Sequence, residues 1–214
     1  MSKAAPRPVI ESAIKNGALK ASKSSFNMTQ DLSAFRKAPE YLLTVKIAEE
    51  IAQKIKPAPI HLERGLHKTL KDASARSNGP RSIEMKTNAR VDVVVSYENG
   101  APRALIEVKH PVNAAVKALY EKDVSRISRA VAASKKKGGT IKFGYFVFTV
   151  FAHAPKTVDM KPARKSVRQR AERIFWAAKK VVSKFACKAK LEVGRIRGLS
   201  DGSAWTVCIL TIAP

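Results

Sequence analysis

The chain has 214 residues and is strongly basic, with 41 Lys and Arg against 17 Asp and Glu and a formal net charge of +24. Its 45% hydrophobic content excludes a wholly disordered chain, and its two cysteines exclude a disulfide framework or a Cys-rich zinc module. No apolar run approaches the roughly 18–20 residues of a membrane helix, and the N-terminus lacks the apolar region of a signal peptide, so we expect no membrane partner and an intracellular protein, cytoplasmic or nucleoid-associated.

The N-terminal part of the chain is predicted to be an arm followed by helices. Residues 1–37 are basic, rich in Ser and Ala and without a sustained hydrophobic period, which predicts a flexible arm, and we expect one domain over 38–214. Pro39 opens a predicted helix with one apolar face, which ends at the Lys-Pro-Ala-Pro of 56–59. A second helix is predicted over 60–76, because leucines recur there at four-residue steps.

The middle of the chain alternates between strand and helix patterns. A weak strand is predicted over 81–86 and a strong, β-branched one over 90–97. An Asn-Gly turn then predicts a hairpin with a return strand over 103–109. A helix is predicted over 113–134, and the most apolar strand, expected at the centre of the sheet, over 141–151.

The C-terminal part adds a long helix, predicted over 163–188, and two strands, predicted over 189–197 and 204–212. The whole order of elements predicts an α/β fold around one mixed sheet, in which a helix, three strands, a helix and a strand form the centre.

Three ionisable residues on the predicted hairpin form the candidate site. Asp92 lies on the first strand, while Glu107 and Lys109 are two apart on the second and therefore project from one face. Ile106 and Val108 project from the other face, into the core. Ionisable groups in a buried sheet are costly unless they are paired or bound to metal, and two converging carboxylates offer the hard oxygen ligands that suit Mg²⁺. A surface cross-strand pair is the alternative.

This segment resembles the PD-(D/E)xK nuclease superfamily, whose fold is that of restriction endonucleases. The family signature is an Asp on one strand and Glu/Asp-x-Lys on the next, here Asp92 and Glu107-Val108-Lys109. The family core is αβββαβ, and the order predicted over 60–151 follows it. The resemblance implies an α/β, restriction-endonuclease-like fold, with Asp92, Glu107 and the main-chain carbonyl of Val108 as ligands of Mg²⁺, for which Mn²⁺ could substitute. The family's usual Pro is replaced here by Val91.

Many members of the family add a glutamate from the helix that precedes the strands. We assign this role to Glu63 in the predicted helix over 60–76, with Glu49 or Glu50 of the earlier helix as rivals and a solvated carboxylate as the alternative. The resemblance gives Lys109 the role of positioning or activating the attacking water. His110 follows Lys109 on the strand but points the opposite way, so a structural role is expected for it.

The basic residues point to a polyanion, because self-repulsion at +24 is costly and nucleic acid is the usual counter-charge. An acidic membrane or a merely basic surface are the alternatives. Trp176, in the basic helix, is expected to pack in the core, with stacking on a base as the alternative. The residues assigned to the phosphate backbone are Lys135, Lys136, Lys137, Arg164, Arg168, Lys179 and Lys180.

Together these features predict a metal-dependent nuclease, an endonuclease that hydrolyses phosphodiester bonds. The resemblance favours DNA over RNA, and it implies a homodimer, since this fold usually needs two sites to cut both strands. A non-catalytic nucleic-acid-binding protein with the same fold, an accessory in defence, repair or phage function, is the alternative. Metal dependence would distinguish the two.

Overall fold

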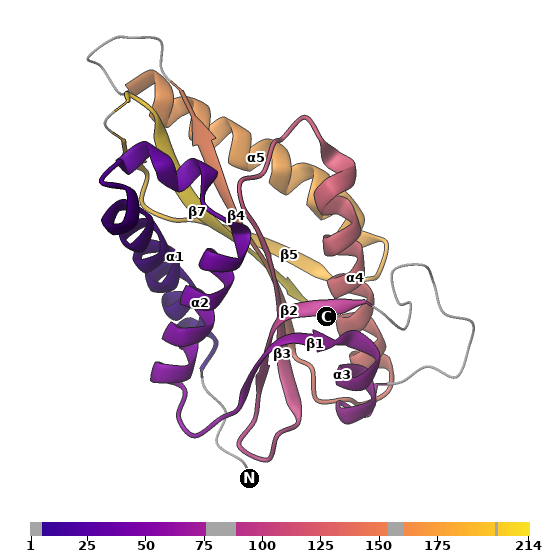
Figure 1. The fold of residues 1–214 in the computed structure, drawn as a ribbon. Coiled ribbons are helices and arrows are strands. Elements are labelled where there is room, and N and C mark those ends of the chain that lie inside the picture. Colours follow the sequence, from indigo (N-terminus) through magenta and orange to yellow (C-terminus); the bar gives the residue numbers. More distant parts are fainter. Residues whose placement is uncertain (1–5, 76–88, 154–160, 200) are drawn as a thin grey trace.

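The computed structural model describes residues 6–75, 89–153, 161–199 and 201–214 (Figure 1). The helices are α1 (Arg7–Thr29), the 3-10 helix η1 (Leu32–Lys37), α2 (Glu40–Lys54), α3 (Leu66–Asp72), α4 (Lys117–Lys136) and α5 (Lys161–Ser183). The strands are β1 (Ile60–Gly65), β2 (Arg90–Ser96), β3 (Pro102–Lys109), β4 (Phe143–Ala152), β5 (Lys188–Val193), β6 (Arg197–Gly198) and β7 (Ala204–Ala213). Within the described ranges, no helix has both the length and the apolar character needed to cross a membrane.

The strands form one mixed sheet in the order β1-β2-β3-β4-β7-β5, with β6 paired to β7 at its side. Only β3 and β4 run parallel; the other pairs among the described strands are antiparallel. β4 lies inside the sheet and all but its first residue are buried, because its side chains are covered on both faces. The predicted α/β class, the mixed sheet and the internal position of the most apolar strand are confirmed.

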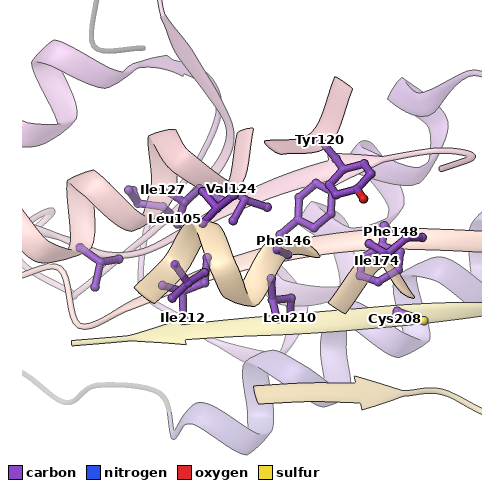
Figure 2. Close-up of a cluster of buried hydrophobic side chains, with 14 of the residues drawn as sticks. Leu105, Tyr120, Val124, Ile127, Phe146, Phe148, Ile174, Cys208, Leu210 and Ile212 are labelled. Carbon is purple, nitrogen blue, oxygen red and sulfur yellow. The ribbon is translucent and has the colours of Figure 1, made fainter. Parts of the chain in front are cut away.

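Two hydrophobic cores lie on opposite faces of this sheet. One face is covered by α4 and α5, and Figure 2 shows Leu105, Phe146 and Leu210 from three neighbouring strands in this core. The other face is covered by α1 and α2 (Figure 1). Alternation along β3 divides the side chains between the cores: Leu105 belongs to the first, and Ile106 to the second.

The predicted flexible arm over 1–37 is wrong for its described part, which is mostly helical. α1 buries seven of its residues and packs against α2 and the sheet. Gly17 allows the close approach, since a Cβ there would lie 2.5 Å from the Cα of Ile47 in α2. The buried face of α1 consists largely of Ala, Gly and Ser, so its hydrophobic period is weak even though the spacing is helical.

The helix predicted over 60–76 is also wrong in its first half, which forms the edge strand β1 and is followed by the short helix α3. β1 pairs antiparallel with β2, and this ladder overrides the helical spacing of the leucines. Leu66 and Leu70 are buried as expected, but Leu62 on β1 is 39% exposed. The strand predicted over 81–86 lies outside the described residues.

The other predicted elements are confirmed with small shifts of their bounds. The hairpin of β2 and β3 turns through Gly100, whose φ of +80° suits glycine. α4 begins four residues later than expected and continues through Lys135 and Lys136, two residues beyond its predicted end. α5 ends at Ser183, and β5 and β7 take the places of the two final strands.

Candidate functional site

The hairpin of β2 and β3 brings Asp92 and Glu107 together. Val93 pairs with Ile106 in the ladder, so the next step along the two strands places Asp92 opposite Glu107. The Asp92 Oδ2 atom accepts a hydrogen bond of 2.7 Å from the N–H of Val108, and its carboxyl group is also hydrogen-bonded to that of Glu107. The strand pattern therefore predicted this pair of carboxyl groups correctly.

Burial makes both carboxyl groups hard to ionise. Burial raises the pKa of Asp92 to about 6 against the stabilising N–H of Val108, and the nearby charges of Glu63 and Glu40 add to the rise. Glu107 is only 3% exposed, and burial together with the negative charge of Asp92 raises its pKa well above the usual value. The pair thus favours a shared proton or a bound cation over two bare negative charges.

Lys109 lies beside this pair at the end of β3. Its Nζ atom is 3.3 Å from Oε1 of Glu40 and 3.9 Å from Oδ2 of Asp123. Burial alone would lower the pKa of Lys109, but these two carboxylates outweigh it and raise the pKa above its ordinary value. The half-buried ammonium group is therefore held in place and charged.

Arg126 of α4 completes the cluster on the same face of the sheet. Its guanidinium group lies 2.7 Å from Oε1 of Glu107 and 2.8 Å from Oδ1 of Asp123. The sequence did not place Arg126 in the site. One turn of α4 thus supplies both a cation for Glu107 and a second carboxylate for Lys109.

The helix carboxylate of this cluster is Glu40, which the sequence did not indicate. Glu40 begins α2, and its Oε2 atom accepts a hydrogen bond of 2.9 Å from the N–H of His110 at the end of β3. The rivals lie about 14 Å further along the helix axis. Glu49 pairs there with Lys46, and buried Glu50 pairs with Lys20.

Glu63 is not a helix residue, so the prediction of its position is wrong. It is an exposed residue of β1 with a φ of +50°, between Leu62, which pairs with Val93, and Arg64, which pairs with Val91. This register places it beside Asp92 on the neighbouring strand, where its charge raises the pKa of Asp92. It remains a candidate for the site, but from the sheet edge.

His110 has the structural role that the strand alternation predicted. It is buried, with Nδ1 2.6 Å from the Thr149 hydroxyl and Nε2 2.7 Å from the carbonyl oxygen of Phe35. Burial lowers its pKa and so favours the neutral ring. Because the Phe35 carbonyl can only accept, Nε2 donates to it, and Nδ1 accepts a hydrogen bond from the Thr149 hydroxyl. The contact ties η1 to the end of β3 and fixes the strand that carries Lys109.

The donor set of Asp92 and Glu107 fits Mg²⁺. Two adjacent buried carboxyl groups offer hard oxygen ligands, and Mg²⁺ is commonly bound through only one or two carboxylates while it keeps several waters. Within the described parts of the chain, no group of three or more His, Cys, Asp and Glu side chains is arranged to hold a metal. The N–H of Val108 binds Asp92, and the carbonyl of the same residue is the ligand that the resemblance implies.

The basic residues assigned to nucleic acid are all exposed and lie at two places. Arg164 and Arg168 line a groove at the start of α5. The charge of Lys135, at the end of α4, acts on Cys187 just beyond α5, so Lys135–Lys137 lie near the end of α5 that carries Lys179 and Lys180. Trp176 is 57% exposed with Nζ of Lys179 4.7 Å from its ring centre, so the expectation that it packs in the core is wrong.

Comparison with known proteins gives no relative from which a function could be transferred. A scan against protein-family models, a search of the curated proteins and a search of the solved structures each found no match.

Proposed function

We propose that this protein is a Mg²⁺-dependent nuclease of the PD-(D/E)xK type that hydrolyses phosphodiester bonds of nucleic acid, with DNA favoured by the family resemblance. The observation that carries the proposal is the buried pair of Asp92 and Glu107 with the charged Lys109 beside it at the end of β3. The element order α2, β1, α3, β2, β3, α4, β4 supports it, since it contains the αβββαβ core of the superfamily with the short helix α3 inserted between the first two strands. In this order α2, rather than a helix over 60–76, opens the core.

In this proposal Asp92, Glu107 and the Val108 carbonyl hold the cation. Bound there, Mg²⁺ would polarise a phosphate oxygen and lower the pKa of a coordinated water. Asp92 is fixed for this role by the N–H of Val108, and Glu107 by Arg126. Arg126 also contacts Asp123, so it keeps a carboxylate partner when the charge of Glu107 is shared with a cation.

Lys109 acts on the phosphate and the attacking water. Its ammonium group is fixed by Glu40 and Asp123 and remains charged, so it can donate hydrogen bonds without rearrangement. A fixed positive charge stabilises the negative charge that develops on the phosphate during attack. In this account Glu40 and Asp123 are positioning residues for Lys109.

Cleavage of supercoiled plasmid tests the proposal. The wild-type protein is expected to nick or linearise the plasmid with Mg²⁺ or Mn²⁺ and to leave it intact in EDTA. Lys109→Ala should lose roughly 10²–10³-fold in rate, which is the effect of removing one fixed donor from a developing oxyanion. Lys142→Ala, at an exposed lysine just before β4, should cleave like the wild type.

Two results would contradict the nuclease proposal. One is cleavage that persists in EDTA, or that is equal in the Lys109→Ala protein. The other is no metal-dependent cleavage of plasmid, single-stranded DNA, branched DNA or RNA. Linear product without a nicked intermediate would support a homodimer with two sites, whereas accumulation of nicked circles would support one site acting at a time.

Binding without cleavage is the second candidate function, and one observation favours it. The guanidinium group of Arg126 already lies 2.7 Å from Glu107, so one of the two carboxyl groups has a counter-charge without a bound metal. A protein of this kind would bind nucleic acid equally well in Mg²⁺ and in EDTA, with affinity that falls steeply as salt increases.

A further inference from the structure

A groove of about 830 Å³ lies between the start of α5 and the segment that links β5 to β6. Five exposed cations line it: Arg164, Lys165 and Arg168 from α5, and Arg195 and Arg197 from the linking segment. Among the described residues, the rest of its lining is apolar or glycine and carries no carboxylate. We propose that this groove binds the phosphate backbone of nucleic acid and leads it to the site at Lys109, an inference that rests on the proposed function.

The charges of the groove have no counter-charge in the described parts of the protein. None of its five cations forms an ion pair with a described residue. Glu192, at the end of β5, is engaged by Lys15 of α1 at 2.6 Å. Five like charges around one groove repel each other, and a bound polyanion relieves this repulsion and releases its own counterions.

The floor of the groove is a fixed piece of backbone. The N–H of Gly194 donates to the carbonyl of Val207 at 2.8 Å, and the Thr206 hydroxyl donates to the carbonyl of Gly194 at 2.9 Å. Arg197 is held by pairing with Trp205 on β7. Cations on a rigid scaffold bind a ligand without first being ordered, which favours a built site over a merely solvated surface.

The groove and the candidate site lie at the same end of the sheet. β3 and β4 run parallel, so Lys109 lies toward the end of β4 that finishes at Ala152. Ala152 pairs with Ala204 of β7, and Ala204 pairs with Gly198 beside the groove. Three strand spacings separate β3 from β5, or about 14 Å, which is a short span for a nucleic-acid strand.

A second basic hollow lies on the other flank of α5, beside the end of β3. It has a volume of about 530 Å³ and joins residues 111–115, which follow Lys109, to His153 at the end of β4 and to Arg170 and Arg173 of α5. Arg173 is exposed, and Arg170 is fixed by a hydrogen bond of 2.7 Å to the carbonyl of Phe151. Successive residues of a helix are about 100° apart, so Arg170 and Arg173 face the end of β3 while Arg164 and Arg168 face the groove, and α5 carries cations on both flanks. Two concave basic surfaces that flank one helix suit a rod-shaped polyanion better than a flat membrane surface.

The double variant Arg168→Glu/Arg197→Glu tests the groove, with Lys54→Glu/Lys56→Glu as a control that changes the net charge equally. Lys54 and Lys56 are exposed and lie where α2 ends, away from the Lys109 end of the sheet. Binding of a fluorescein-labelled DNA duplex and single strand is measured in EDTA by fluorescence anisotropy over a range of salt. Circular dichroism and thermal melting check that each variant is folded.

The groove variant is expected to bind DNA at least about tenfold more weakly than the control. The slope of the logarithm of its binding constant against the logarithm of salt concentration should be shallower by roughly 0.9 for each lost phosphate contact. Equal binding of DNA by the two variants would overturn the proposal. The proposal would also be overturned if the groove variant bound DNA like the control and lost only its binding to vesicles of anionic phospholipid. If the groove variant binds DNA normally and cleaves it in a metal-dependent way, the proposal for the groove is refuted and the nuclease proposal stands. If the groove variant binds DNA weakly and the wild type cleaves no substrate, the nuclease proposal is refuted and the proposal for the groove stands.

Discussion

Replacing Asp92 by Asn is expected to abolish metal-dependent cleavage and, at neutral pH, to stabilise the fold. Burial raises the pKa of Asp92 from 3.8 to about 6, so the folded protein binds this proton more tightly than the unfolded chain does. The free-energy cost of charging Asp92 is therefore absent below the unfolded pKa of 3.8. It grows as the pH rises from there to about 6 and is then complete. Asn still accepts the hydrogen bond from Val108 but carries no charge, so it removes this cost.

Urea unfolding at two pH values measures the effect. Asp92→Asn should increase the free energy of unfolding by up to about 3 kcal/mol near pH 8 and leave it unchanged near pH 3.5. Asp31→Asn is the control, because hydrogen bonds from Ser33 lower the pKa of exposed Asp31 and its neutralisation brings no such gain. A loss of stability in the Asp92→Asn protein near pH 8 would show that this carboxylate is not held at a cost to folding.

The Arg126→Ala substitution is expected to have the opposite effect on stability. It would leave Glu107 buried at 3% exposure without the guanidinium group that now lies 2.7 Å from it. Removing one partner of a buried ion pair typically costs roughly 3–5 kcal/mol. Glu107 can become neutral by taking up a proton. The loss of stability in Arg126→Ala should therefore be small in acid and should grow as the pH rises.

A double-mutant cycle separates this ion pair from simple loss of packing. Adding Glu107→Gln to Arg126→Ala should restore most of the lost free energy of unfolding at neutral pH, since no buried charge remains. Lys122→Ala, at an exposed residue one turn earlier on α4, should stay within about 0.5 kcal/mol of the wild type. If the double variant is no more stable than Arg126→Ala alone, the loss comes from packing, and Arg126 is not the counter-charge of Glu107.

The central part of the site could be predicted because it depends on local pattern. The alternation of a β-hairpin fixes which side chains share a face, so Asp92, Glu107 and Lys109 could be grouped from spacing alone. Glu40 could not be, because it reaches the site only through the way α2 packs across the sheet and begins near His110. No spacing in the sequence carries that information.

The errors in the fold have equally specific causes. Residues 60–65 have the leucine spacing of a helix, but pairing with β2 makes them a strand, and this moved Glu63 from a helix to the sheet edge. α1 was missed because Ala, Gly and Ser carry most of its buried face, so its hydrophobic signal is weak. The basic groove depends on the return of the chain from α5 to β6, which brings together cations about thirty residues apart in sequence.

The central claim, that Asp92 and Glu107 bind a divalent cation, is tested most directly by titrating the protein with Mn²⁺ and following the free ion by electron paramagnetic resonance. We expect a saturable site in the wild type that weakens as the pH falls below about 6, because protons then compete for the carboxylates. Mg²⁺ should displace the Mn²⁺, and the Asp92→Asn protein should lack the site. Absence of a saturable site in the wild type, or its persistence in the Asp92→Asn protein, would contradict the claim.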